Sequence, residues 1–247
     1  MTYITVINTL NKPDINKKVH YDAVKNYFKK DVATKSGYYQ PTKNHPKQQK
    51  IFDLCQSILE DIVDDNPDLI RAIDAGCGIG DFTIEMAENF PQFDHIIGID
   101  FLKEVITIAS KKIKDDKKLS FLQSDLLNIP FFNKIFDVTI CLDVFHHIHN
   151  DDFQSVIGEL ARITNKYLIV EIRNKKNIFY FWYAYVVHPL FYRNLPVSTT
   201  SIDEVNNLIG KFHFQLFLAS RIASTRYSCR RLILVYKRVD GTKSCEI

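Results

Sequence analysis

A short glycine-rich stretch limits the possible folds of this chain more than any other sequence feature. Residues 74–81 read Asp-Ala-Gly-Cys-Gly-Ile-Gly-Asp, directly after an apolar strand predicted at 70–75 and directly before a helix predicted at 81–90. Glycine lets the backbone turn sharply and lets a ligand approach it without meeting a Cβ atom. The start of the following helix offers unpaired N–H groups. The stretch therefore predicts a ligand-binding turn, with a tight strand-to-helix connection as the alternative.

Strands and helices alternate around this stretch. Apolar strands are predicted at 95–100, 119–123, 136–142 and 167–172, and helices at 21–31, from Pro46 to a stop at 64–67, at 101–113 and at 151–164. The first twenty residues are expected to be loop. A later helix at 201–209 has Ser201 as N-cap and Glu204 completing a capping box, and final strands are expected at 212–219 and 231–238. This alternation predicts an α/β fold with a parallel sheet and helices on both faces.

The glycine spacing distinguishes between two classes of ligand. A dinucleotide-binding turn needs a small residue at its sixth position, but here Gly76, Gly78 and Gly80 alternate and the sixth position is Asp81. A pyrophosphate beside Asp81 would meet like charge, whereas Asp74 suits a ligand with a cationic end. S-adenosylmethionine has an ammonium and a sulfonium group and carries no phosphate.

Acidic residues also end the next two strands. Asp100 closes the strand at 95–100, where a carboxylate can accept hydrogen bonds from ribose hydroxyls. Asp125 follows the strand at 119–123 and could accept from an adenine amino group, with Leu126 packed on the ring. The alternative for Asp125 is a turn or helix-cap role.

In combination these residues resemble the class I S-adenosylmethionine-dependent methyltransferases, in particular the ubiquinone/menaquinone-biosynthesis-like (methyltransferase type 11) group. The similarity runs from about residue 70 to 172 and includes the stretch from 136 to His147. It implies a doubly wound, seven-stranded, mostly parallel Rossmann-like sheet in the order 3-2-1-4-5-7-6, with the last strand antiparallel. It also implies S-adenosylmethionine as cofactor, Phe101 beside the adenine and Leu142 in the cofactor cleft. The expected cofactor-binding residues are Asp74, Gly76, Cys77, Gly78, Gly80, Asp100, Phe101, Asp125, Leu126 and Leu142.

Histidines follow the fourth predicted strand, at the edge where open α/β sheets bind ligands. An imidazole there could act as a general base when the acceptor must lose a proton. His146 and His147 are therefore the candidate catalytic residues, with packing inside the loop as the alternative. Because no carboxylate or cysteine is seen to converge on these histidines, no metal site is predicted.

An aromatic segment at 178–192 follows the fifth strand and predicts a small, apolar or aromatic acceptor, methylated on oxygen, nitrogen or carbon. Alternatives for the segment are a core helix, a homodimer contact or an interfacial helix. The turn after the fourth strand lacks the Asn/Asp-Pro-Pro-aromatic tetrad of many nucleic-acid methyltransferases. With a net charge of only +3, nucleic acid is not expected as a substrate.

We expect one methyltransferase domain over 1–247, divided into an N-terminal helical cap (1–66), a cofactor-binding core (67–173) and an acceptor-side insertion with the final strands (174–247). Tyr38 and Tyr39 are candidates for closing the cleft. Five scattered cysteines and the absence of a long apolar run predict a cytoplasmic protein without stable membrane insertion. Two other functions stay open: an S-adenosylmethionine-binding regulatory protein without turnover, and a nicotinamide-dependent oxidoreductase.

Overall fold

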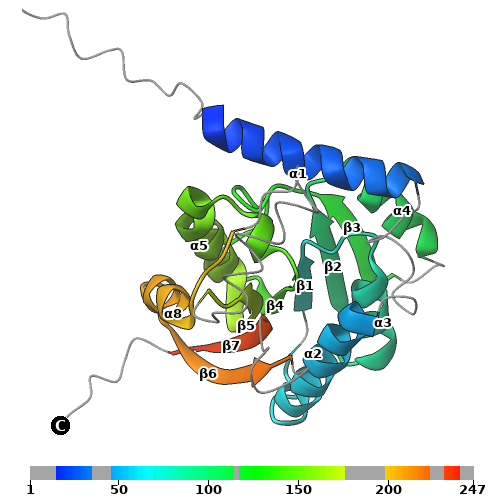
Figure 1. Cartoon of the computed structure of the whole chain (residues 1–247). Coiled ribbons are helices and arrows are strands. Elements are labelled where there is room, and N and C mark those ends of the chain that lie inside the picture. Colours follow the sequence, from blue (N-terminus) through cyan, green and yellow to red (C-terminus); the bar gives the residue numbers. More distant parts are fainter. Residues whose placement is uncertain are drawn as a thin grey trace, which may run out of the picture.

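Seven strands form one sheet in the order β3-β2-β1-β4-β5-β7-β6 (Figure 1). The computed structural model describes residues 15–34, 46–69, 71–113, 117–175, 198–222 and 231–239. The strands are β1 (Arg71–Ala75), β2 (His95–Asp100), β3 (Leu119–Gln123), β4 (Phe136–Cys141), β5 (Thr164–Arg173), β6 (Phe214–Arg221) and β7 (Arg231–Arg238). Neighbours among β1 to β5 pair in parallel, and β7 runs antiparallel to both β5 and β6. The expected sheet order and the antiparallel last strand are confirmed.

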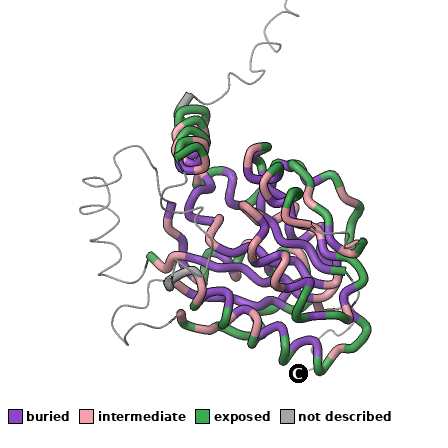
Figure 2. The backbone as a smooth tube through the Cα atoms, turned by 90° about the vertical axis from the view of Figure 1, so that its right-hand side faces the viewer, coloured by how far each residue is buried: buried purple, intermediate pink, exposed green. Residues whose placement is uncertain are grey.

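Helices cover both faces of the sheet. They are α1 (Ile15–Thr34), α2 (Pro46–Asp64), α3 (Asp81–Asn89), α4 (Lys103–Lys112), α5 (Phe153–Ile163) and α8 (Ile202–Gly210), with two short 3-10 helices, η3 (Phe145–His147) and η4 (Asn150–Asp152). One apolar cluster joins α5 and α8 to the sheet, and a second joins α2 and α3 to its other face. The central strands are accordingly buried on both faces (Figure 2), which explains their continuous apolar sequences.

The element boundaries agree closely with the sequence pattern where the signal is local. The Ser201 hydroxyl accepts the N–H of Glu204 at 3.3 Å, and the Glu204 carboxylate accepts the N–H of Ser201 at 3.0 Å, so the predicted capping box is present. The expectation of a loop over the first twenty residues is wrong for 15–20, which are helical. Tertiary contacts made by Lys17 and His20 hold this first part of α1.

Some expectations concern residues outside those that the structure describes. Tyr38, Tyr39 and the aromatic segment at 178–192 are among them. The limits proposed for the cap, core and acceptor-side parts stay predictions. Among the described residues, no helix is both long enough and apolar enough to cross a bilayer.

Arg238, at the end of β7, joins the sheet to the end of α5. Its guanidinium donates to the carbonyls of Ala161 and Thr164, each at 2.6 Å, and to those of Asn165 and Phe212, each at 3.1 Å. The last carbonyls of a helix have no partner within the helix. A cation at that end also complements the helix dipole. Arg238 therefore satisfies backbone acceptors that the fold would otherwise leave unpaired.

We predict that Arg238→Ala lowers the free energy of unfolding by about 2 kcal/mol or more, because several half-buried carbonyls lose a charged donor. Urea denaturation followed by circular dichroism measures the change. Arg221→Ala is the matched control, since Arg221 is an exposed arginine at the end of β6, and it should change stability by less than about 0.5 kcal/mol. Equal effects of the two substitutions would contradict this role for Arg238.

Candidate functional site

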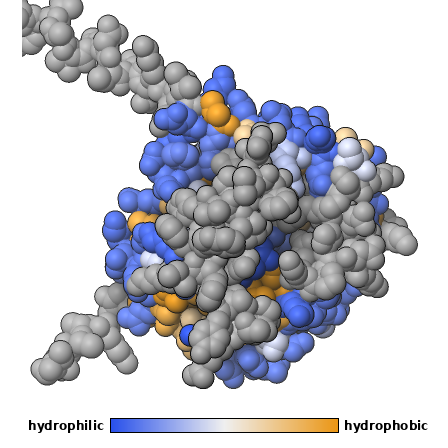
Figure 3. All heavy atoms as spheres, in the orientation of Figure 1, coloured by the Kyte–Doolittle hydropathy of each residue, from blue (hydrophilic) through white to orange (hydrophobic). Residues whose placement is uncertain are grey.

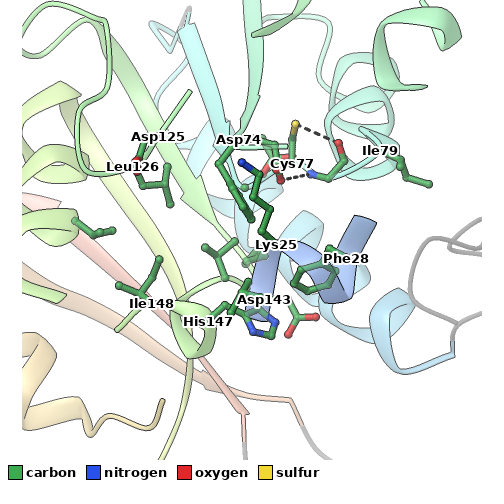
Figure 4. A pocket seen from close by; sticks show the side chains of 18 of the residues that line it. Lys25, Phe28, Asp74, Cys77, Ile79, Asp125, Leu126, Asp143, His147 and Ile148 are labelled. Carbon is green, nitrogen blue, oxygen red and sulfur yellow. Dashed lines mark hydrogen bonds between the residues drawn. The ribbon is translucent and has the colours of Figure 1, made fainter. Parts of the chain in front are cut away.

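A cavity of about 340 Å³ lies at the carboxyl ends of β1, β2 and β4, where open α/β sheets bind ligands. Figure 4 shows side chains from α1, from the glycine stretch and from the turn after β4 around this space. Its volume falls within the range of small-molecule sites, about 300–1,000 Å³. The lining residues predicted from the sequence are Asp74, Gly76, Cys77, Gly78, Asp100, Phe101, Asp125, Leu126, Leu142 and His147.

The glycine stretch turns sharply below the cavity. Gly76 has a φ of +87°, and a Cβ atom there would lie 2.1 Å from Cγ2 of Val144, so a side chain cannot fit without a shift. The N–H groups of Gly76 and Cys77 both donate to the carbonyl of Ile99, at 2.7 and 2.9 Å. These bonds tie the end of β1 to the end of β2 and form a backbone cradle.

Gly80 does not share this position. It is not among the residues that line the cavity. A Cβ atom there would lie 2.5 Å from the ring of Phe121 and 2.9 Å from Cβ of Ala109, at a φ of +80°. Gly80 thus has a packing role at the start of α3, and its expected contact with a ligand stays a prediction.

Two buried carboxylates form the polar floor of the cavity. Asp100 accepts the N–H of Gly78 at 3.1 Å and that of Leu102 at 2.9 Å, yet burial still raises its pKa to about 6. Asp74 is 3% exposed and accepts the Thr83 hydroxyl at 2.6 Å. Burial raises the pKa of Asp74 to about 7, and the Thr83 bond only partly offsets this. Both carboxylates are costly to ionise, and a cation placed beside them would reduce that cost.

The described lining is strongly acidic. It contains six aspartates, Asp22, Asp74, Asp81, Asp100, Asp125 and Asp143. Lys25 of α1 is the one lysine or arginine among the described lining residues. Outside the lining, Lys112 pairs with Asp81. The cavity therefore favours a ligand that carries positive charge.

Asp125 combines the two roles considered for it. It lines the cavity, and its Oδ1 accepts the N–H of Leu127 at 2.9 Å, as a turn residue does. Leu126 beside it is 8% exposed, and Phe101, on the neighbouring strand end, is 38% exposed. An apolar surface next to a carboxylate is the arrangement that a flat heterocycle with an amino group requires.

Of the two candidate catalytic histidines, only His147 lines the cavity. Its ring packs edge-on against Phe28 with 5.0 Å between centroids, and its carbonyl lies 2.9 Å from Nε2 of His20. His146 is 2% exposed and does not line the cavity. Its Nδ1 lies 3.8 Å from Oδ1 of Asp143. The two histidine rings contact each other, with 3.8 Å between centroids, and His147 is the one of the two in the cavity lining.

A charged cluster beside His146 was missed by the sequence reasoning. Ligand atoms of Asp143, His146 and Glu171 lie within 4.8 Å of one another, so the expectation that no carboxylate converges on these histidines is wrong. Arg231 pairs with both carboxylates, at 3.0 Å from Glu171, and Arg173 lies 3.4 Å from Asp143. These guanidinium groups take the carboxylate oxygens that a metal ion would need. The available signal was Glu171 itself, a charged residue inside the otherwise apolar run 167–172 of β5.

The predicted aromatic segment leaves and rejoins the described chain next to this cluster. The N–H of Lys175 donates to the carbonyl of Thr200 at 2.9 Å, and the N–H of Ser198 donates to the carbonyl of His146 at 2.7 Å. We call these bonds the neck of the segment 176–197. The neck lies at η3 (Phe145–His147), which we call the histidine turn and which carries the cavity residue His147.

Residues 72–166 match the family of methyltransferase domains. A demethylmenaquinone methyltransferase from Lactococcus lactis is 31% identical over 97 residues, which are 38% of this chain and 37% of that protein. Another, from Geobacillus sp. strain WCH70, is 27% identical over 132 residues, 49% of this chain and 55% of that protein. This chain therefore covers less than two thirds of the length of either relative.

Solved structures share the fold. Magnesium protoporphyrin IX methyltransferase from Synechocystis PCC 6803, with bound S-adenosylhomocysteine, superposes with a TM-score of 0.66 at 20% identity, covering 89% of this chain and all of that one. The N-methyltransferase NodS from Bradyrhizobium japonicum gives 0.65 at 11% identity with the same coverages. The matched residues 72–166 contain the glycine stretch, Asp100, Asp125 and the histidine turn. Residues 72–166 therefore match a methyltransferase domain and are similar to demethylmenaquinone methyltransferases, and the chain shares the fold of solved methyltransferases.

Proposed function

We propose that this protein transfers a methyl group from S-adenosylmethionine to a small, apolar or aromatic acceptor. The observation that carries the proposal is the joint presence, in one cavity, of a glycine cradle and two buried carboxylates whose pKa values burial has raised. Such carboxylates gain from a cationic ligand. S-adenosylmethionine, when bound, supplies an electrophilic methyl group on a positively charged sulfur.

The residues present fit this cofactor in charge and shape. In the proposal, Asp74 faces its cationic amino-acid end, and Asp100 accepts hydrogen bonds from its ribose. Asp125 accepts from the adenine amino group, beside the apolar surfaces of Leu126 and Phe101. Cys77, Gly76 and Gly78 give the close backbone approach, and Leu142 completes the apolar lining. Lys25, the one cation of the described lining, suits the carboxylate of the amino-acid end.

The acceptor is placed, in this proposal, toward His147 and Ile148. Val144, Ile148 and Val156 give the lining apolar side chains, together with the polar Asp143 and His147 of the turn after β4. The neck holds both ends of the aromatic segment beside the same turn. The relatives named above act, by name, on demethylmenaquinone, which is consistent with an apolar acceptor. His147 would accept a proton from an acceptor that must lose one, and holding the acceptor in line with the methyl group accelerates transfer by itself.

Calorimetry with S-adenosylmethionine and with NAD tests the cofactor. We expect S-adenosylmethionine to bind and NAD not to bind, because a pyrophosphate would meet the acidic lining. Asp100→Asn should weaken binding at least tenfold, since it removes the charge and disturbs the bond to Gly78. Asp94→Asn, an exposed aspartate just before β2, is the matched control and should bind normally. Binding of NAD alone would refute the proposal.

We predict that the affinity for S-adenosylmethionine rises with pH between about pH 5.5 and pH 8 and then levels off. The pKa values of Asp74 and Asp100 are raised to about 7 and about 6, so both carboxyls are partly protonated at the low end of this range. A cationic ligand prefers the ionised forms, and binding therefore releases protons in this window. Titrations across the range measure the slope, and Asp74→Asn should remove its upper part. A flat profile for the unmodified protein would contradict the assignment.

An acceptor screen with quinols, phenols, amines and RNA, detecting S-adenosylhomocysteine, tests the other half of the reaction. We expect small-molecule acceptors to be methylated and RNA not. For an acceptor that loses a proton, His147→Gln should lower turnover at least tenfold and leave cofactor affinity within about threefold. His95→Gln, an exposed histidine at the start of β2, should have no effect. Activity on RNA alone would overturn the acceptor class. Cofactor binding without turnover on any acceptor would favour a regulatory protein.

A further inference from the structure

Helix α1 forms one wall of the cavity but has a small apolar contact with the rest of the protein. Tyr21, Asp22, Val24, Lys25 and Phe28 all line the cavity. Over its 20 residues, the buried apolar side chains described are Val24 and Phe28, which pack on Leu102, Val105 and Ile106 near α4. The face of α1 seen in Figure 3 is mostly hydrophilic, and Figure 2 shows α1 at the edge of the molecule. Apolar packing alone therefore fixes only part of this helix.

The carboxylate of Asp152 holds the first part of the helix, while Lys29 pairs with Glu104 of α4 toward the other end. Oδ1 of Asp152 accepts from Nζ of Lys17 at 2.8 Å, and its Oδ2 accepts from the hydroxyl of Tyr21 at 2.8 Å. Lys17 and Tyr21 are four residues apart, so they lie on one face of the helix. The Tyr21 oxygen also accepts the N–H of His149 at 3.2 Å. Asp152 thus uses both oxygens to hold one turn of α1, and its side chain is only 12% exposed.

The position of Asp152 gives these bonds a functional consequence. Asp152 ends η4, the 3-10 turn that follows directly on the segment carrying His147 and Ile148. Nε2 of His20, on α1, lies 2.9 Å from the carbonyl of His147. The cavity walls on α1 and on the histidine turn are therefore held at a fixed separation by contacts 127 to 135 residues apart in sequence.

We propose that Asp152 holds α1 over the ligand cavity and thereby sets how slowly a bound ligand dissociates. We call its two contacts, with Lys17 and Tyr21, the latch. Asp152 is a positioning residue, since it acts through Lys17 and Tyr21 and does not line the cavity. The identity of the ligand, S-adenosylmethionine, rests on the proposed function, but the closure of the helix does not. When the latch is lost, α1 opens while the sheet and its two apolar clusters stay intact.

Hydrogen–deuterium exchange on the full chain tests the latch directly. Asp152→Asn removes the charge that holds Lys17. The amides of 15–34 should then exchange at least tenfold faster, while those of β1 and β4 keep their protection. Tyr21→Phe keeps the ring in the cavity wall and removes only the hydroxyl, and it should give a smaller increase. Asp151→Asn is the matched control, because the Asp151 side chain is 61% exposed and neighbours Asp152. In the double variant, the two changes should not add, since they remove one shared contact.

Cofactor kinetics provide the second measurement. In Asp152→Asn, S-adenosylmethionine should dissociate at least fivefold faster and its KM should rise, while kcat stays within about twofold. Unchanged exchange in α1, or exchange that rises equally in β1 and β4, would overturn the latch. If both aspartate and tyrosine variants exchange like the unmodified protein, the helix is held by other contacts. Failure of S-adenosylmethionine to bind the unmodified protein would refute the proposed function, and the exchange result would still decide whether Asp152 holds α1.

Discussion

The sharp turn after β1 is the constraint on which the rest of the site depends. Gly76 and Cys77 both donate to the carbonyl of Ile99, and the space that a side chain on Gly76 would need is filled by Val144. These contacts bring the carboxyl ends of β1, β2 and β4 to one point. The floor carboxylates Asp74 and Asp100 lie at that point because each ends, or nearly ends, its strand. A turn with a larger radius would leave no cradle and would separate the two carboxylates.

The buried carboxylates of this protein fall into two kinds. Glu171 is fully buried, and burial raises its pKa to about 7. Arg231 lies 3.0 Å from its carboxylate, so a cation of the protein itself balances the charge of the ionised form. Among the described residues, no cation pairs with Asp74 or Asp100: a hydroxyl and backbone N–H groups are the partners that lower their pKa values. Burying a charge without a counterion is unfavourable. The difference indicates a structural role for Glu171 and a ligand-binding role for the two aspartates.

The histidine turn connects several parts of the site. Its backbone holds the neck through the carbonyl of His146 and contacts α1 through the carbonyl of His147. The same turn places the His147 side chain in the cavity and leaves His146 behind it, against Asp143. Movement of this turn would therefore affect α1, the neck and His147 together.

Local features of the fold and the candidate cofactor-binding residues can be predicted from the sequence alone. The glycine stretch, the strand ending at Asp100 and the capping box at Ser201 are each specified within a few residues, so periodicity and turn chemistry suffice to find them. The predictions of the sheet order and of Phe101 and Leu142 as cofactor contacts rest on the family resemblance, whereas those of Asp74, Asp100 and Asp125 rest on the chemistry and position of these residues. The sequence pattern did not show that Gly80 has a packing role, because the ring that a side chain at this position would clash with belongs to the distant residue Phe121.

Which distant side chains contact each other depends on the tertiary structure. Glu171 and Arg231 lie 60 residues apart in sequence and pair across β5 and β7. Asp152 holds the start of α1 from 135 residues away, which is why local propensity failed to show that the helix begins at Ile15. The ranking of His147 over His146 depends on the direction in which a short 3-10 turn points two adjacent side chains. The sequence pattern of charged and hydroxyl-bearing side chains does not show which residues they pair with. Their pairing depends on how the sheet and helices pack around them.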